Sequence, residues 1–145
     1  MIRKATTDDL THVAVLMTEL WPHHTVEELV EECHQANGSE CAFFLAEENG
    51  SPVAFAQCQL RHDYVEGTEH SPVGNLEGIY VRKSHRGNGI AKALLRASER
   101  WAAEQGCEEF ASDCELTNSE SLAVHLSVGF AEANRIICFT KKLDR

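Results

Sequence analysis

The spacing of hydrophobic residues along the chain predicts amphipathic helices separated by short strands. Apolar side chains recur every three or four positions in the helical segments, and threonines stand where the first two helices would begin. The first helix should end at Trp21-Pro22, because proline disfavours a helical conformation in the residue before it. The predicted helices cover residues 8–20, capped by Thr6 or Thr7 and with Asp8 and Asp9 in the first turn, and residues 26–36, 90–105 and 118–128.

Short apolar or alternating runs bounded by turn residues predict the strands. They cover residues 2–5, 41–46, 53–62, 76–81, 108–114 and 136–142. Asn49-Gly50 predicts a hairpin turn, and the polar segment 63–72 predicts a loop. The resulting order β-α-α-β-β-β-α-β-α-β indicates an α/β fold with a mostly antiparallel sheet, and 145 residues suit a single domain over 1–145.

A polar turn joins the strand at 76–81 to the long helix after it. Its glycines allow close approach of a ligand to the backbone, and the first amides of the helix point outward without intrahelical partners. This combination predicts a phosphate site, the alternative being an ordinary glycine-capped turn. It is not a mononucleotide P-loop, and Lys92 replaces the third glycine of a dinucleotide fingerprint. The turn is Arg86-Gly87-Asn88-Gly89-Ile90-Ala91.

Arg86, Gly89 and Ala91 fit the pattern Arg/Gln-x-x-Gly-x-Gly/Ala, so the turn resembles the pyrophosphate-binding signature of the GNAT acyltransferases. The element order of the whole chain resembles this family as well. The resemblance implies the GNAT fold, with helices on both faces of a mixed sheet and splayed central strands, and acetyl-CoA as co-substrate. The residues it implies for the cofactor are Arg86, Gly87, Asn88, Gly89, Ile90 and Ala91 for the pyrophosphate, the backbone of Ile79, Tyr80 and Val81 for the pantetheine and thioester, and Asn118.

Several short segments resemble a narrower group, the aminoglycoside 6'-N-acetyltransferases. They are Leu20-Trp21-Pro22, Arg61-His62-Asp63-Tyr64-Val65, Leu76-Glu77-Gly78-Ile79, Ala111-Ser112-Asp113, and His125 ahead of Gly129-Phe130. The implied reaction is direct acetyl transfer to the 6'-amine of a polycationic antibiotic in a ternary complex, conferring resistance. Two alternatives stay open: a GNAT enzyme for another small amine or a protein N-terminus, and a non-catalytic acyl-CoA-binding module.

Glu77 is an isolated carboxylate in the middle of a strand, which is unfavourable unless the group is paired or belongs to a site. The adjacent Gly78 predicts a β-bulge. We expect Glu77 to face the incoming amine and to be a candidate general base. The alternative is a carboxylate that only pairs with the substrate cation or with a basic residue of the fold.

Four further residues are predicted to bind substrate by the same resemblance: Trp21, His24, Tyr64 and Asp113. Trp21 could instead pack in the core, Asp113 could belong to the cap of the next helix, and His23 competes with its neighbour. His125 stands where many GNAT enzymes have a tyrosine that protonates the departing thiolate. It is a candidate general acid, or alternatively a packed helix histidine.

Composition limits the classes of ligand and the cellular location that we expect for this chain. With 13 basic and 23 acidic residues the formal charge is −10, which argues against nucleic acid and suits either a cationic ligand or solubility alone. No apolar run is long enough for a membrane span or a signal peptide, so a cytoplasmic protein is expected. The six cysteines lack metal-site spacing, so no metal and no disulfides are expected. The resemblance also implies a homodimer, and the apolar residues around 136–139 would permit C-terminal strand exchange.

Overall fold

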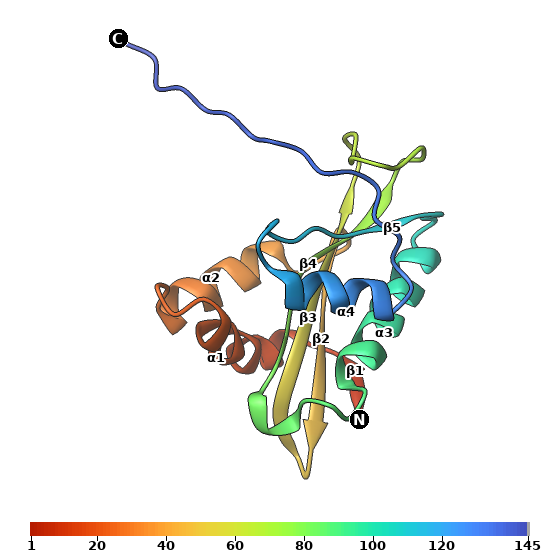
Figure 1. The fold of residues 1–145 in the computed structure, drawn as a ribbon. Helices are drawn as coiled ribbons and strands as arrows, with labels where there is room; N and C mark the ends of the chain where they lie inside the picture. The colour runs from red at the N-terminus through yellow and green to blue at the C-terminus, as the bar shows by residue number, and fades with distance from the viewer. Residues whose placement is uncertain (145) are drawn as a thin grey trace. The chain divides into compact units, whose positions relative to one another are not determined.

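Five strands form one sheet in the order β1-β2-β3-β4-β5 (Figure 1). The computed structural model describes residues 1–144. All neighbouring strands are antiparallel except β4 and β5, which are parallel. The strands are β1 (Ile2–Lys4), β2 (Cys41–Glu48), β3 (Ser51–Arg61), β4 (Val73–Val81) and β5 (Phe110–Ala111).

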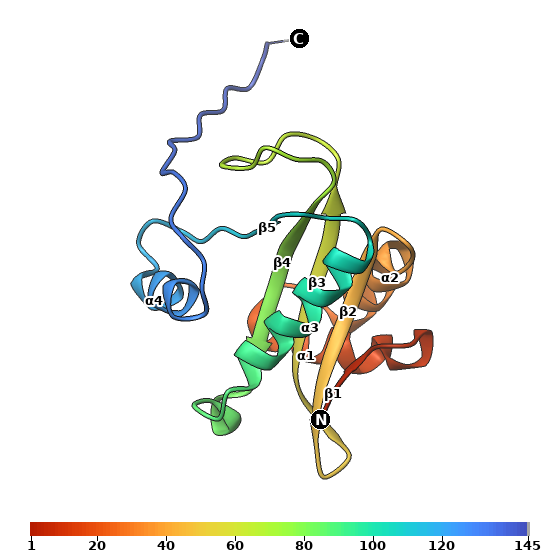
Figure 2. The ribbon, with the colours of Figure 1, turned by 90° about the vertical axis from the view of Figure 1, so that its right-hand side faces the viewer.

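Helices cover both faces of this sheet (Figures 1 and 2). On one face lie α1 (Leu10–Leu20) and α2 (Val26–Ala36), and on the other lies α3 (Ile90–Glu104). The first six residues of β2 are buried without interruption, as expected for a strand covered on both sides. The α/β fold with helices on both faces is therefore confirmed.

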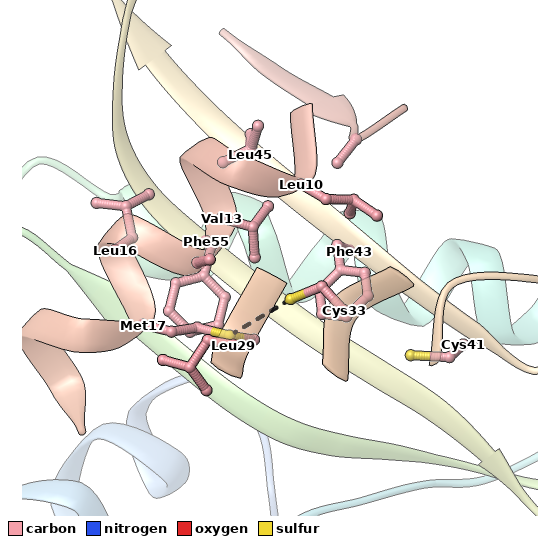
Figure 3. Close-up of a cluster of buried hydrophobic side chains, with 12 residues drawn as sticks. Leu10, Val13, Leu16, Met17, Leu29, Cys33, Cys41, Phe43, Leu45 and Phe55 are labelled. Carbon is pink, nitrogen blue, oxygen red and sulfur yellow. Dashed lines mark hydrogen bonds between the residues drawn. The ribbon is translucent and has the colours of Figure 1, made fainter. Parts of the chain in front are cut away.

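The core between the sheet and the first two helices is built from their apolar stripes. Phe43, Leu45 and Phe55 project from β2 and β3 into this layer, and Figure 3 shows them packed against α1 and α2. The helices supply Leu10, Val13, Leu16, Met17, Leu29 and Cys33.

Local sequence signals set the helix ends as predicted. A short 3-10 turn, η1 (Thr7–Asp9), leads into α1, which ends at Leu20, directly before Trp21-Pro22. The side chain of Thr25 accepts a hydrogen bond from the amide of Glu28 and so caps α2. At the predicted hairpin, Asn49 and Gly50 have φ angles of 52° and 79°, the positive values that a two-residue turn requires.

The pairing of β4 with β5 is confined to two positions. Gly74 lies opposite Phe110 and Asn75 opposite Ala111, after which β4 continues to Val81 without β5 beside it. The strand predicted over 108–114 is therefore much shorter than expected, because the two strands separate. This separation confirms the predicted splay.

The chain divides into two compact units, one of residues 1–113 and one that begins at Cys114. The second unit contains α4 (Ser119–Ser127), within the predicted 118–128 helix. The strand predicted over 136–142 is wrong for this structure, since residues 130–144 contain neither helix nor strand. A strand forms only where a neighbouring strand pairs with its backbone, and the described part of the chain offers none here. The single domain over 1–145 stays a prediction.

Candidate active site

A β-bulge places Glu77 and Gly78 on the same face of β4. In the ladder with β3, Gln57 lies opposite Gly78 and the next residue, Cys58, lies opposite Leu76. Glu77 therefore has no residue opposite it on β3. The extra residue interrupts the alternation of side chains. Both Glu77 and the open side of Gly78 consequently face the layer of α1 and α2. The bulge predicted from Gly78 is confirmed.

The indole ring of Trp21 lies against Gly78. A Cβ atom at Gly78 would stand 2.9 Å from Cη2 and 3.3 Å from Cζ2 of this ring. Only glycine therefore allows the ring to approach β4 so closely. Phe55 meets the ring edge-on, with centroids 6.3 Å apart and planes at 62°. Trp21 remains 36% exposed, so it forms a wall of the site and is not a buried core residue.

A cavity of about 350 Å³ lies between α1, α2 and the sheet. Glu77, Trp21 and His24 line it together, so three of the predicted substrate-binding residues share one space. Of the two neighbouring histidines, it is His24 that lines the cavity. Its Nδ1 atom lies 3.3 Å from Glu28 Oε2. The other polar lining residues are Glu32 and Gln57, and the apolar ones are Met17, Leu29, Cys33, Ala36 and Phe43.

The carboxylate of Glu77 is held by two donors from the sheet. Arg61, the last residue of β3, donates from Nη2 to Oε2 at 2.8 Å and to Oε1 at 3.0 Å, and from Nε to Oε2 at 3.3 Å. Asn75 Nδ2, two residues earlier on β4, also donates to Oε2. The side chain of Glu77 is only 21% exposed, and these contacts compensate the burial of its charge. The pairing with a basic residue that was the alternative for Glu77 thus occurs in this structure, and its contact with substrate stays a prediction.

Tyr64 and Asp113 do not line this cavity. Tyr64 lies on the loop between β3 and β4, where 75% of it is exposed and its hydroxyl accepts a hydrogen bond from the amide of Gly67 at 3.4 Å. Asp113 is exposed two residues beyond the end of β5. Their roles in substrate binding stay predictions.

The predicted pyrophosphate turn has the backbone shape that anion binding requires. Gly87 and Gly89 have φ angles of 84° and 79°, and beyond the adjacent residues no atom lies within 4 Å of where their Cβ atoms would be. Gly89 is also the N-cap of α3, whose first backbone hydrogen bond runs from the amide of Ala93 to the carbonyl of Gly89 at 3.0 Å. The amides of residues 90–92 therefore have no acceptor within the helix and stand at its positive end.

Arg86 ties this turn to the end of β4. Its Nε donates to the carbonyl of Val81 at 2.8 Å, and its guanidinium lies 5.7 Å from the centre of the Tyr80 ring. The Tyr80 hydroxyl donates to Glu19 of α1 at 3.0 Å, and burial together with this carboxylate raises the pKa of Tyr80. The positive turn and the splayed part of β4 are thus held next to each other.

The model of the acetyltransferase (GNAT) family matches residues 5–130 of this chain. The chain belongs to this family. The turn at the start of α3 and the splayed β4 both lie within the matched residues. For Ile79, Tyr80, Val81 and the residues of the turn, contact with the co-substrate itself stays a prediction.

Relatives of this GNAT chain cover nearly its whole length. The "aminoglycoside N(6')-acetyltransferase type 1" of Stenotrophomonas maltophilia is 41% identical over 145 residues, which is 99% of this chain and 94% of the relative. The solved structure of AAC(6')-Iy with the bisubstrate analog CoA-S-monomethyl-acetylneamine has a TM-score of 0.94 at 38% identity, covering 99% of this chain and 98% of that chain. A structure of AAC(6')-Iy with CoA gives the same TM-score and identity, covering 99% and 95%.

Two predicted residues of this GNAT chain lie in the second unit. Asn118 is the N-cap of α4, where its side chain accepts a hydrogen bond from the amide of Ser121 at 3.0 Å. His125 Nδ1 lies 2.7 Å from the carbonyl of Ser121, and its ring lies 5.1 Å from that of Phe130. Both side chains thus have local structural partners, and their catalytic and cofactor roles stay predictions.

Cys33 lies at the cavity wall, where Figure 3 shows its thiol directed at Met17. Sγ donates to Met17 Sδ at 3.7 Å, and burial raises the pKa of the thiol to about 12. It is therefore not a thiolate near neutral pH and lacks the form that attacks a thioester. Among the described residues, no group of three or more His, Cys, Asp and Glu side chains is placed to hold a metal ion. No helix within residues 1–144 is long and apolar enough to cross a membrane.

Four polar residues of the site were not predicted from the sequence as site residues. Asn75 and Gln57 received no role, and Arg61 was noted only as part of a motif. The signal was present in β3, where Gln57, Gln59 and Arg61 occupy alternate positions and so share one face of the strand. Glu32, on α2, carries no comparable local signal.

Proposed function

We propose that this chain transfers the acetyl group of acetyl-CoA directly to the 6'-amine of aminoglycoside antibiotics. The observation that carries the proposal is the placement of Glu77 by the β-bulge into a cavity walled by Trp21, beside the splayed end of β4. The full-length similarity to aminoglycoside N(6')-acetyltransferases and to a structure with a bisubstrate analog supports the same reaction.

The residues at the start of α3 suit the co-substrate. The amides of residues 90–92, which have no acceptor within the helix, favour a pyrophosphate at the start of α3. The edge of β4 that β5 leaves unpaired suits an extended pantetheine arm. Bound acetyl-CoA supplies the activated acetyl group as a thioester. The chain contributes positioning, since fixing two reactants side by side removes much of the entropic barrier.

Glu77 receives the acceptor amine. An aminoglycoside amine arrives as an ammonium group and must lose a proton before it can attack a thioester carbonyl. A carboxylate in direct contact, or one water away, can bind the cation and accept this proton, a role typically worth ~10²–10⁴ in rate. Trp21 offers an aromatic face for a sugar ring, and His24 offers an imidazole in the same cavity lining.

The transfer is direct, within a ternary complex. A covalent acyl-cysteine route would need an ionised thiol at the cavity, and the only cavity thiol in residues 1–144, Cys33, is held protonated by burial. His125 is proposed to protonate the leaving thiolate, Asn118 to contact the co-substrate, and Tyr64 and Asp113 to pair with the other polar groups of the antibiotic. In the cell, proposed to be the cytoplasm, this reaction would confer aminoglycoside resistance.

A homodimer is proposed as the working form. The C-terminal residues Ile136, Ile137, Phe139 and Leu143 are between 64% and 89% exposed. Such a run of exposed apolar side chains without strand partners is typical of a segment that packs on another chain. Light scattering coupled to size-exclusion chromatography would remove this part of the proposal by showing a monomer at the working concentration.

The reaction is tested by thiol release from acetyl-CoA with three acceptors: kanamycin, an aminoglycoside with a 6'-hydroxyl group, and spermidine. Release only with the 6'-amine supports both the reaction and its position, whereas release only with spermidine would assign the chain to polyamine acetylation. Tight acetyl-CoA binding without release would indicate a binding module.

The role of Glu77 is tested with Glu77→Gln, which keeps the shape of the side chain but removes its charge. We expect kcat/KM for kanamycin to fall about a hundredfold or more. Glu99→Gln, an exposed residue of α3, removes the same charge elsewhere and should leave turnover unchanged. Unchanged turnover in the Glu77 variant would show that this carboxylate has no part in the reaction.

A further inference from the structure

The carboxylate proposed to receive the substrate's ammonium group already holds a cation. Three of the four hydrogen bonds to Glu77 come from the guanidinium of Arg61, which reaches both oxygens. A carboxylate offers about four lone-pair positions, so little acceptor capacity remains for a second cation. Without a further role, Arg61 would be unfavourable next to this cavity, because its positive charge repels a polycationic substrate.

We propose that Arg61 is a resident counter-cation of Glu77, which the ammonium group of the acceptor replaces on binding. The inference rests on the proposed function, since it concerns the same carboxylate and the same ligand. Arg61 would thereby determine specificity: a cationic group restores the charge balance of Glu77 after Arg61 leaves, and a hydroxyl group does not.

The two donors to Glu77 differ in their freedom to leave. Asn75 lies inside β4, paired with Gln59 on β3 and with Ala111 on β5, so its short side chain stays with the carboxylate. Arg61 is the last residue of β3, its side chain is 47% exposed, and the 62–72 loop follows it. Its long side chain can swing into solvent, where the guanidinium is well hydrated.

The charges near the cavity keep the free-energy cost of replacing Arg61 by the substrate cation small. Glu32 lines the same cavity from α2, and Glu28 lies 3.3 Å from the lining residue His24, so further carboxylates accompany Glu77 near the incoming cation. A half-exposed ion pair contributes little net free energy, on the order of a two- to fivefold change in an equilibrium constant. Substrate binding can therefore displace Arg61 at a small loss of affinity.

The test is calorimetric binding to the full chain with two ligands, kanamycin and an aminoglycoside bearing a 6'-hydroxyl group. Arg61→Gln should lower the Kd for kanamycin about two- to fivefold and leave the Kd for the hydroxyl compound nearly unchanged. Arg61→Lys keeps the cation and should retain the wild-type Kd for kanamycin within about twofold. Arg100→Gln removes one positive charge from the exposed side of α3, on the other face of the sheet, and controls for net charge.

An unchanged or weaker affinity of Arg61→Gln for kanamycin would overturn the inference. So would an equal gain with both ligands or with Arg100→Gln, because that pattern reflects net charge only. Failure of the wild-type chain to bind either aminoglycoside would remove the proposed function along with the inference. If the wild-type chain binds kanamycin and Arg61→Gln has the same Kd, the inference about Arg61 is wrong but the proposed function stands.

Discussion

Replacing Gly78 by alanine should damage the acceptor site while leaving the fold intact. The new Cβ atom would stand 2.9 Å from Trp21 Cη2, whereas unstrained carbon contacts begin at about 3.5 Å. The indole ring must therefore withdraw by about 0.6 Å or more from β4. Because a displacement of about 1 Å in a positioning residue can cost a hundredfold, we expect kcat/KM for the aminoglycoside to fall about tenfold to a hundredfold. The free energy of unfolding should fall by only about 1 kcal/mol, since the partly exposed ring can move toward solvent.

A double-mutant cycle with Trp21→Phe tests the stated cause. The two clashing atoms belong to the six-membered ring of the indole, which phenylalanine does not place there. In the Trp21→Phe background, Gly78→Ala should therefore change kcat/KM by less than about threefold. Thiol release with acetyl-CoA and kanamycin measures the activity, and urea unfolding measures the stability. An equal loss from Gly78→Ala in both backgrounds would refute the steric argument.

Two further predictions concern stability. A Cβ atom at Gly74 would lie 2.6 Å from Ala102 Cβ and 2.8 Å from Phe110 Cδ1, so Gly74→Ala should lower the free energy of urea unfolding by roughly 1–3 kcal/mol. Gly38→Ala, where nothing lies within 4 Å of the new Cβ atom, is the control and should leave the unfolding midpoint unchanged. An unchanged midpoint in Gly74→Ala as well would contradict this prediction. Two hydrogen bonds from Arg3 hold the pKa of Asp9 well below its ordinary value, so the stability it contributes is present above about pH 4 and is lost as the pH falls below that. Asp9→Asn should therefore lower the free energy of unfolding at neutral pH and reduce the further loss of that free energy in acid. An equal loss in acid for the variant and the wild type would contradict the role of the Arg3–Asp9 ion pair.

Much of the fold followed from local patterns. The 3.6-residue spacing of apolar side chains, the cap at Thr25 and the Asn49-Gly50 turn each act within a few residues, so the sequence carries them in a readable form. The strands at the C-terminal end could not be predicted as well from local sequence. A strand exists only through its neighbour, and both the length of β5 and the fate of residues 136–142 depend on which backbone lies beside them.

By itself, the sequence determined the α/β pattern, the glycine turn before α3 and the unusual position of Glu77 in a strand. The tertiary structure alone decided how Glu77 is used: a register shift against β3 turns it toward α2, and Arg61 then meets its carboxylate across the sheet. The same shift gives Trp21 its place over Gly78. The physical reason is that backbone preference is local, whereas the partners of a side chain depend on strand register and helix packing, which only the assembled fold determines.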